Sequence, residues 1–156
     1  MWRPRSPPSD PTASVNVLRV TADSNIFISG LNFAGTPRQI LNLAESGAIH
    51  LAVSDDILNE VTRVLRREKF GWPEVEIRRA LTQISRFAQH VRPKQRIDAI
   101  AEDPTDDRIL ECAVASQSGY LVTGDNHLLR LGHFGGTKIV KPADFLKIHA
   151  EAGRER

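Results

Sequence analysis

The sequence predicts one α/β domain, a three-layer α/β/α sandwich whose central, mostly parallel sheet has four or five strands. Two observations favour this class. Short apolar runs typical of buried parallel strands alternate with segments whose apolar residues recur every 3.6 residues, as in helices. Strands that alternate with helices usually join a parallel sheet through crossover connections. The length of 156 residues, with 40% hydrophobic residues, suits a single globular domain.

The first predicted strand leads directly to an acidic residue. Residues 17–22 are nearly all apolar or β-branched, as a buried parallel strand should be. The run stops at Asp23, and a short helix is expected from Ser24 to about Gly30. In α/β folds, ligands bind in the crevice beyond the carboxyl ends of the strands, so Asp23 stands at a position typical of a site.

Two helices flank the second strand. Thr36 and Pro37 provide a cap and a pre-organised first turn for a helix that stops at Gly47. Residues 49–53 form the second strand. Ser54 caps the next helix, which has acidic residues in its first turn and an apolar stripe of helical period.

The remaining elements continue the alternation. A break at residues 71–73 precedes a helix that runs to about Gln89, and a short strand is expected from Val91. Turn and cap residues delimit the other elements, which are a helix from 103 to Gly119, a strand at 120–123, a short helix at 125–131, a strand at 137–140 and a helix from Pro142.

The ends of the chain are predicted to lie outside the domain. Residues 1–16 are rich in proline and lack the apolar core of a secretory signal, so they predict a disordered arm or an upstream translation start. The domain is expected to cover residues 17–150, and residues 151–156 form a polar tail.

The composition excludes several kinds of protein. A single cysteine, Cys112, rules out an internal disulfide framework and suits a reducing compartment, so we expect a cytoplasmic protein. No cysteine or histidine pair has zinc-ligand spacing, and no apolar run approaches a membrane span. The net charge of +2 permits nucleic-acid binding without indicating it.

Four acids could converge on one edge of the sheet and bind a hard divalent cation. Asp23 and Asp125 each end a predicted strand, Glu60 shares a helix face with apolar residues, and Asp107 is expected to point inward. Asp106 is expected to face solvent. Each acid also has a purely structural interpretation, as a turn or cap residue, as an acid favoured by a helix dipole, or, for Glu60, as the partner of a nearby arginine.

These motifs, taken together and in this order, resemble the PIN-domain family of ribonucleases over about residues 17–148. The resemblance is strongest to the VapC-type toxins of bacterial toxin–antitoxin pairs. It rests on four segments, which are Asp23-Ser24-Asn25 with Ser29, Glu60 within 57–61, Asp106-Asp107 within 106–115, and Leu121-Val-Thr-Gly-Asp125 before Leu128-Leu129. The family has a further acid two residues after the fourth, where this chain has His127.

The resemblance implies a metal-dependent endoribonuclease. It assigns Asp23, Glu60, Asp107 and Asp125 as ligands of Mg²⁺ or Mn²⁺ and as the catalytic residues. Expected partners are an RNA substrate, a cognate antitoxin and a second copy of the chain, with no membrane. Polar residues expected to support the site are Ser24, Asn25, Thr123 and Asn126. Basic residues at the end of the Glu60 helix are candidate phosphate contacts, namely Arg63, Arg66, Arg67 and Lys69.

Other functional classes fit less well. A haloacid-dehalogenase-like phosphatase needs a second Asp where this chain has Asn25, and a receiver domain needs a Lys that is missing after a later strand. A PIN-like module that binds RNA or protein without cutting is the alternative to the nuclease. It predicts the loss of one acid, whereas all four are present.

Overall fold

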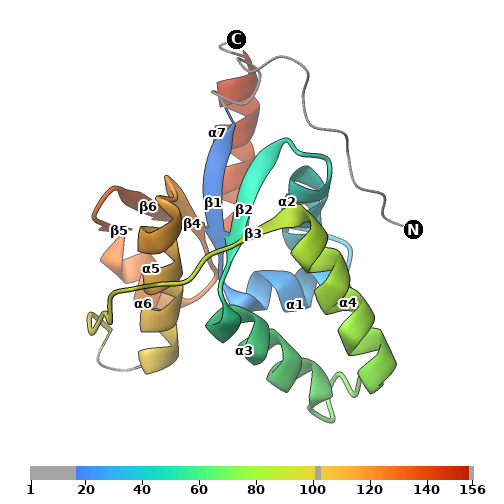
Figure 1. Cartoon of the computed structure of the whole chain (residues 1–156). Coiled ribbons are helices and arrows are strands. Elements are labelled where there is room, and N and C mark those ends of the chain that lie inside the picture. The colour runs from blue at the N-terminus through green and yellow to red at the C-terminus, as the bar shows by residue number, and fades with distance from the viewer. Residues whose placement is uncertain (1–16, 101–102, 155–156) are drawn as a thin grey trace.

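The structure, a computed structural model, describes residues 17–100 and 103–154. The predicted N-terminal arm lies outside these residues. Within them, six strands form one sheet in the order β3-β2-β1-β4-β6-β5 (Figure 1). The strands are β1 (Leu18–Ala22), β2 (Ile49–Val53), β3 (Ala88–His90), β4 (Tyr120–Val122), β5 (His133–Phe134) and β6 (Thr137–Val140).

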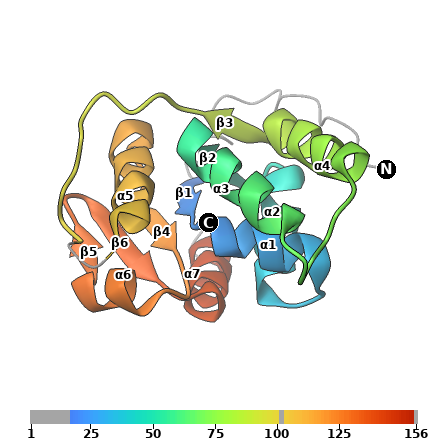
Figure 2. The ribbon, with the colours of Figure 1, turned by 90° about the horizontal axis from the view of Figure 1, so that it is seen from below.

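Helices cover both faces of this sheet, which confirms the predicted α/β/α sandwich. They are α1 (Ser24–Asn32), α2 (Thr36–Glu45), α3 (Asp55–Arg66), α4 (Glu74–Phe87), α5 (Pro104–Ser116), α6 (Asn126–Leu131) and α7 (Pro142–Arg154). Helix α5 packs on β1 and β2 from one side, while α2 and α7 pack together on the opposite side (Figure 2). Helix α7 runs four residues past the predicted domain end at residue 150, and that boundary stays a prediction.

The central strand, β1, is built from the apolar run that the sequence singles out. Val20 and Ala22 are fully buried, and β1 pairs in parallel with β2 on one side and β4 on the other. Ala22 stands opposite Val122, and the backbone N–H of Asp23 donates a 3.0 Å hydrogen bond to the Val122 carbonyl. The residues that follow β1 and β4 therefore emerge side by side at one edge of the sheet.

Several element boundaries differ from the predictions. The short third strand begins at Ala88 rather than near Val91, because β3 pairs with β2 directly after α4. Helix α5 ends at Ser116 rather than at Gly119, with Gln117 in the left-handed region at φ 54°. The two-residue strand β5 was not predicted, and it raises the strand number above the expected four or five.

Candidate functional site

Asp23 and Thr123 meet where two neighbouring strands end. The Thr123 hydroxyl donates a 2.6 Å hydrogen bond to Asp23 Oδ2. Asp23 Oδ1 accepts from the Ser24 hydroxyl and from the Asn25 backbone N–H, each at 3.2 Å. Burial raises the pKa of the Asp23 carboxyl, and these three hydrogen bonds act in the opposite direction. Three of the four predicted supporting residues thus contact Asp23.

Asp125 caps the helix that follows β4. Its Oδ1 accepts from the backbone N–H groups of His127 and Leu128, at 2.8 and 3.1 Å. The backbone N–H of Asp125 donates to Thr123 Oγ1 at 2.9 Å, so Thr123 links the carboxylate of Asp23 to the backbone of Asp125. Asn126, the fourth predicted supporting residue, is the exposed first residue of α6.

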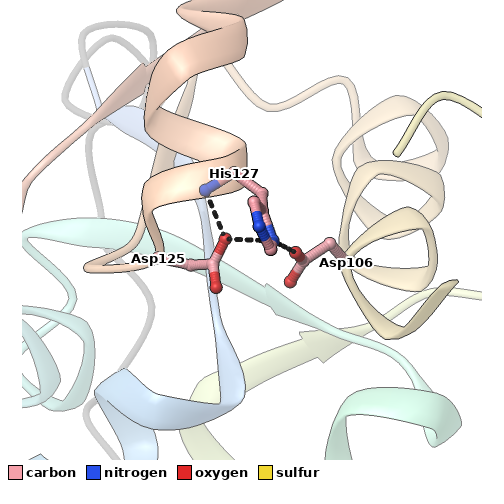
Figure 3. A group of neighbouring side chains, drawn as sticks. All are labelled: Asp106, Asp125 and His127. Atoms are coloured by element: carbon pink, nitrogen blue, oxygen red, sulfur yellow. Dashed lines mark hydrogen bonds and ion pairs between the residues drawn. The ribbon is translucent and has the colours of Figure 1, made fainter. Parts of the chain in front are cut away.

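Asp106 joins this cluster from the first turn of α5. Its side chain is 6% exposed, and Oδ2 lies 3.7 Å from His127 Nδ1, which itself lies 3.8 Å from Asp125 Oδ1 (Figure 3). Among the described residues, neither Asp106 Oδ2 nor His127 Nδ1 has a hydrogen-bond partner. Burial, with the negative charges of Asp125 and Asp103, raises the pKa of Asp106 to about 8. The prediction that Asp106 faces solvent is wrong.

Asp107 is not brought into the cluster. Its Oδ1 accepts from the backbone N–H groups of Ala99 and Ile100, at 2.9 and 2.8 Å. Residues 91–100, the described part of the segment after β3, form no strand or helix, and buried carboxylates of α5 accept hydrogen bonds from three of their amides instead. Asp107 thus has a structural contact of its own, and its assignment as a metal ligand stays a prediction, whereas Asp106 is the acid of this turn that lies in the cluster.

Sequence reasoning missed Asp106 and His127 for different reasons. Asp106 and Asp107 are both buried in the first turn of α5, so helical periodicity alone could not separate them. His127 could have been found from its position, because residues two after a helix cap lie close to the capping side chain. Its backbone N–H bonds to Asp125 Oδ1, which holds the imidazole at the cluster.

Glu60 stands apart from the cluster, across a pocket between α3 and α5. The pocket has a volume of about 300 Å³, and its lining includes Glu60, Arg63, Arg108 and also Ser24, the neighbour of Asp23. Glu60 forms an ion pair with Arg63, with Arg63 Nη2 2.6 Å from Oε1 and 2.7 Å from Oε2. Glu60 therefore makes the salt bridge to a nearby arginine that the sequence left open as its structural interpretation. Glu60 also lines the pocket beside the cluster.

The four basic residues predicted to contact RNA, which lie in the last turn of α3 or just after it, differ in the partners they have in this structure. Arg66 pairs with Glu74 at 2.6 Å, as Arg63 does with Glu60. Arg67 is exposed and makes no ion pair with any residue that the structure describes. The Lys69 ammonium lies 5.6 Å from the centre of the Phe70 ring. Their role in RNA binding stays a prediction.

Comparison with known proteins identifies the family. Residues 19–127, more than two thirds of the chain, match the family model described as PIN domain. The chain belongs to the PIN domain family. A solved structure with a similar fold is titled "Crystal structure of VapBC2 from Rickettsia felis bound to a DNA fragment from their promoter". Its matching chain has a TM-score of 0.52 and 15% identity, and the match covers 80% of this PIN domain chain and 98% of that chain. No curated protein sequence matches.

PIN domains are in general nucleases that use divalent metals, and the donor set of this PIN domain fits such an ion. Three buried or half-buried carboxylates, those of Asp23, Asp106 and Asp125, gather at the carboxyl edge of the sheet. Ligand atoms of Asp106, Asp125 and His127 all lie within 4.8 Å of one another. An unpartnered buried carboxylate oxygen such as Asp106 Oδ2 is costly unless a proton or a cation meets it. None of the described helices has the length and hydropathy that crossing a bilayer requires.

Proposed function

We propose that this PIN domain is a metal-dependent endoribonuclease. The observation that carries the proposal is Asp106 Oδ2, which is buried without a hydrogen-bond partner and faces Asp125 and His127. Asp23, Asp106 and Asp125 would hold Mg²⁺ or Mn²⁺, and Glu60 would act from across the pocket. When bound, the ion would lower the pKa of an attacking water and offset charge on the phosphate.

The residues of the chain prepare the site for that ion. Thr123 holds Asp23 and the backbone of Asp125 in fixed positions, so little reorganisation is needed on binding. The pKa of about 8 for Asp106 means that ion binding near neutral pH displaces a proton from this carboxyl. No histidine or lysine is needed as a general base, and we expect products with 5′-phosphate and 3′-hydroxyl ends.

The basic residues beside the pocket would bind the RNA backbone. Arg67 and Lys69 lie at the end of α3, the helix that carries Glu60. Arg63 would exchange its contact with Glu60 for an RNA phosphate when Glu60 turns to the ion. This exchange would couple substrate binding to completion of the acidic site.

We also propose that the protein is the toxin of a toxin–antitoxin pair, acts in the cytoplasm as a homodimer and is neutralised by a cognate antitoxin. The support is the likeness of the fold to a chain of the VapBC2 structure. A PIN-like module that binds RNA or protein without cutting is the second candidate. The bidentate Arg63–Glu60 contact favours it, because this contact occupies one of the four acids.

The test is cleavage of a mixed pool of structured RNA by the purified protein with Mn²⁺, with Mg²⁺ and with EDTA. Asp106→Asn and Asp107→Asn serve as a matched pair of variants. We expect metal-dependent cleavage that Asp106→Asn abolishes and Asp107→Asn retains. No cleavage by folded protein that binds Mn²⁺ would favour the binding module.

A further inference from the structure

His127 occupies the place where the sequence departs from the acid of the family pattern. The imidazole lies between two carboxylates from different elements, Asp106 on α5 and Asp125 at the start of α6 (Figure 3). Its Nδ1 atom is buried and has no hydrogen-bond partner among the described residues. The nitrogen thus points into the carboxylate cluster rather than toward solvent.

The separations suit ligands of one ion better than hydrogen bonds. Nδ1 lies 3.7 Å from Asp106 Oδ2 and 3.8 Å from Asp125 Oδ1. A charge-assisted N–H···O bond would bring these atoms to about 2.7–2.9 Å. Neighbouring ligands of an ion bound at about 2.1 Å lie roughly 3–3.5 Å apart, so a small side-chain adjustment would bring all three atoms onto one cation.

A nitrogen donor changes which cation the cluster prefers. Sites made only of carboxylates and water suit Mg²⁺ and also Mn²⁺, whereas imidazole suits the later first-row metals Fe, Ni, Cu and Zn. Mg²⁺ also keeps several waters and dehydrates reluctantly. Replacing a family acid by histidine removes one negative charge and supplies a softer ligand, and both changes disfavour Mg²⁺.

We propose that His127 Nδ1 is a direct metal ligand, completing an Asp106–Asp125–His127 set that binds divalent first-row transition metals in preference to Mg²⁺. This inference rests on the proposed nuclease site and deepens it by naming the class of ion. The backbone supports it, since the His127 N–H and the Asp125 carboxylate are already joined at 2.8 Å, which fixes the imidazole beside its co-ligand.

The first test is pulsed electron paramagnetic resonance of Mn²⁺ bound to the full-length protein without RNA. A directly bound imidazole gives ¹⁴N modulation of the electron spin echo. We expect this modulation in the parent protein and in His133→Ala, which alters an exposed histidine of β5. We expect it to vanish in His127→Asn. Modulation that persists in His127→Asn, bound Mn²⁺ without modulation, or no binding of Mn²⁺ would each overturn the proposal.

The second test measures Mn²⁺ and Mg²⁺ affinities by isothermal titration. His127→Ala should weaken Mn²⁺ binding at least about tenfold, in line with losses seen when the surroundings of a metal are altered. His127→Asp should bring the two affinities closer together by strengthening Mg²⁺ binding. An unchanged ratio of affinities in His127→Asp would contradict the preference proposed for His127.

These measurements separate the two proposals. If the ¹⁴N modulation depends on His127 but the protein cuts no RNA, His127 is a metal ligand and the proposed nuclease activity is wrong. If the protein cuts RNA with metal but its bound Mn²⁺ gives no ¹⁴N modulation, the nuclease activity is supported and the proposal that His127 is a metal ligand is wrong. Circular dichroism of each variant confirms that the fold is retained.

Discussion

Asp106 and Asp107 are neighbours in the sequence whose carboxylates make different contacts. The Asp107 carboxylate accepts two backbone hydrogen bonds and holds the segment that leads into α5. The Asp106 carboxylate has a buried oxygen without a partner and lies beside Asp125 and His127. One acid is satisfied by the protein itself, and the other is available to a ligand.

This difference predicts that substitution of Asp107 lowers stability, whereas substitution of Asp106 removes metal binding. Asp107→Ala leaves two backbone N–H groups without their acceptor and should lower the free energy of unfolding by about 2–3 kcal/mol. Asp107→Asn keeps an acceptor oxygen and should lose less. Both variants should bind Mn²⁺ like the parent, whereas Asp106→Asn should not. Urea unfolding and Mn²⁺ titration measure these two properties, and loss of Mn²⁺ binding by folded Asp107→Asn would restore Asp107 as a ligand.

The raised pKa of Asp106 predicts how stability depends on pH without metal. With a pKa of about 8, the folded state keeps a proton that the unfolded state loses near its ordinary value of 3.8. The folded state therefore binds more protons between about pH 4 and pH 8, and stability should fall as the pH rises through this range. Asp23 contributes part of this decrease in stability, because burial raises its pKa as well.

Asp106→Asn should remove much of this dependence. In EDTA at pH 8 the variant should exceed the parent in stability by on the order of 1–3 kcal/mol. Thermal unfolding of both proteins from pH 5 to pH 8.5 measures the difference. A parent protein whose stability rises steadily with pH over this interval would show that the Asp106 carboxylate is better solvated than the structure places it.

At the scale of elements, α1 and α2 approach closely at Gly30. A Cβ added there would lie 2.5 Å from Leu41 Cδ1 and 3.3 Å from the Pro37 carbonyl carbon. Leu41 is itself buried, so it has little room to move. The absence of a side chain at Gly30 thus lets α1, which follows Asp23, pack against α2.

Gly30→Ala should therefore destabilise the fold. Overpacking a core contact costs about 1–3 kcal/mol, which exceeds the roughly 1 kcal/mol that alanine gains over glycine in a helix. We expect a net loss of up to about 2 kcal/mol. Gly136→Ala is the matched control, because nothing lies within 4 Å of its added Cβ. Equal stability of the two variants in urea would show that α1 and α2 adjust freely.

At the scale of the whole molecule, the exposed cations Arg67 and Lys69 come just after α3, the helix that carries Glu60. Arg67→Ala with Lys69→Ala should weaken RNA binding and reduce the slope of log K against log salt concentration by about 1–2. Arg66→Ala is a useful comparison, since Arg66 already pairs with Glu74 and should change the slope less. Binding to RNA in Ca²⁺ from 50 to 300 mM salt measures this, and equal slopes would exclude Arg67 and Lys69 as phosphate contacts.

The sequence predicts the architecture in more detail than the contacts of the site residues. Strands such as β1 and β2 are visible because each is a local apolar run, and Asp23 and Asp125 follow because parallel strands end at one edge. The two-residue strand β5 forms only by pairing with β6, so no local pattern marks it. Which of Asp106 and Asp107 faces the cluster depends on where the segment before α5 crosses that helix. This is a tertiary contact, which no local sequence pattern reveals.

The position of β1 in the sheet also has a consequence for synthesis of the chain. β1 is made first, yet one of its two neighbours is β4, and the Thr123–Asp23 hydrogen bond joins residues 100 positions apart. A nascent chain that has left the ribosome only as far as α4 can pair β1 with β2, but it holds neither Asp106 nor Asp125. The proposed nuclease therefore stays inert on the ribosome, among the RNAs that surround it, until its last third emerges and inserts β4 beside β1.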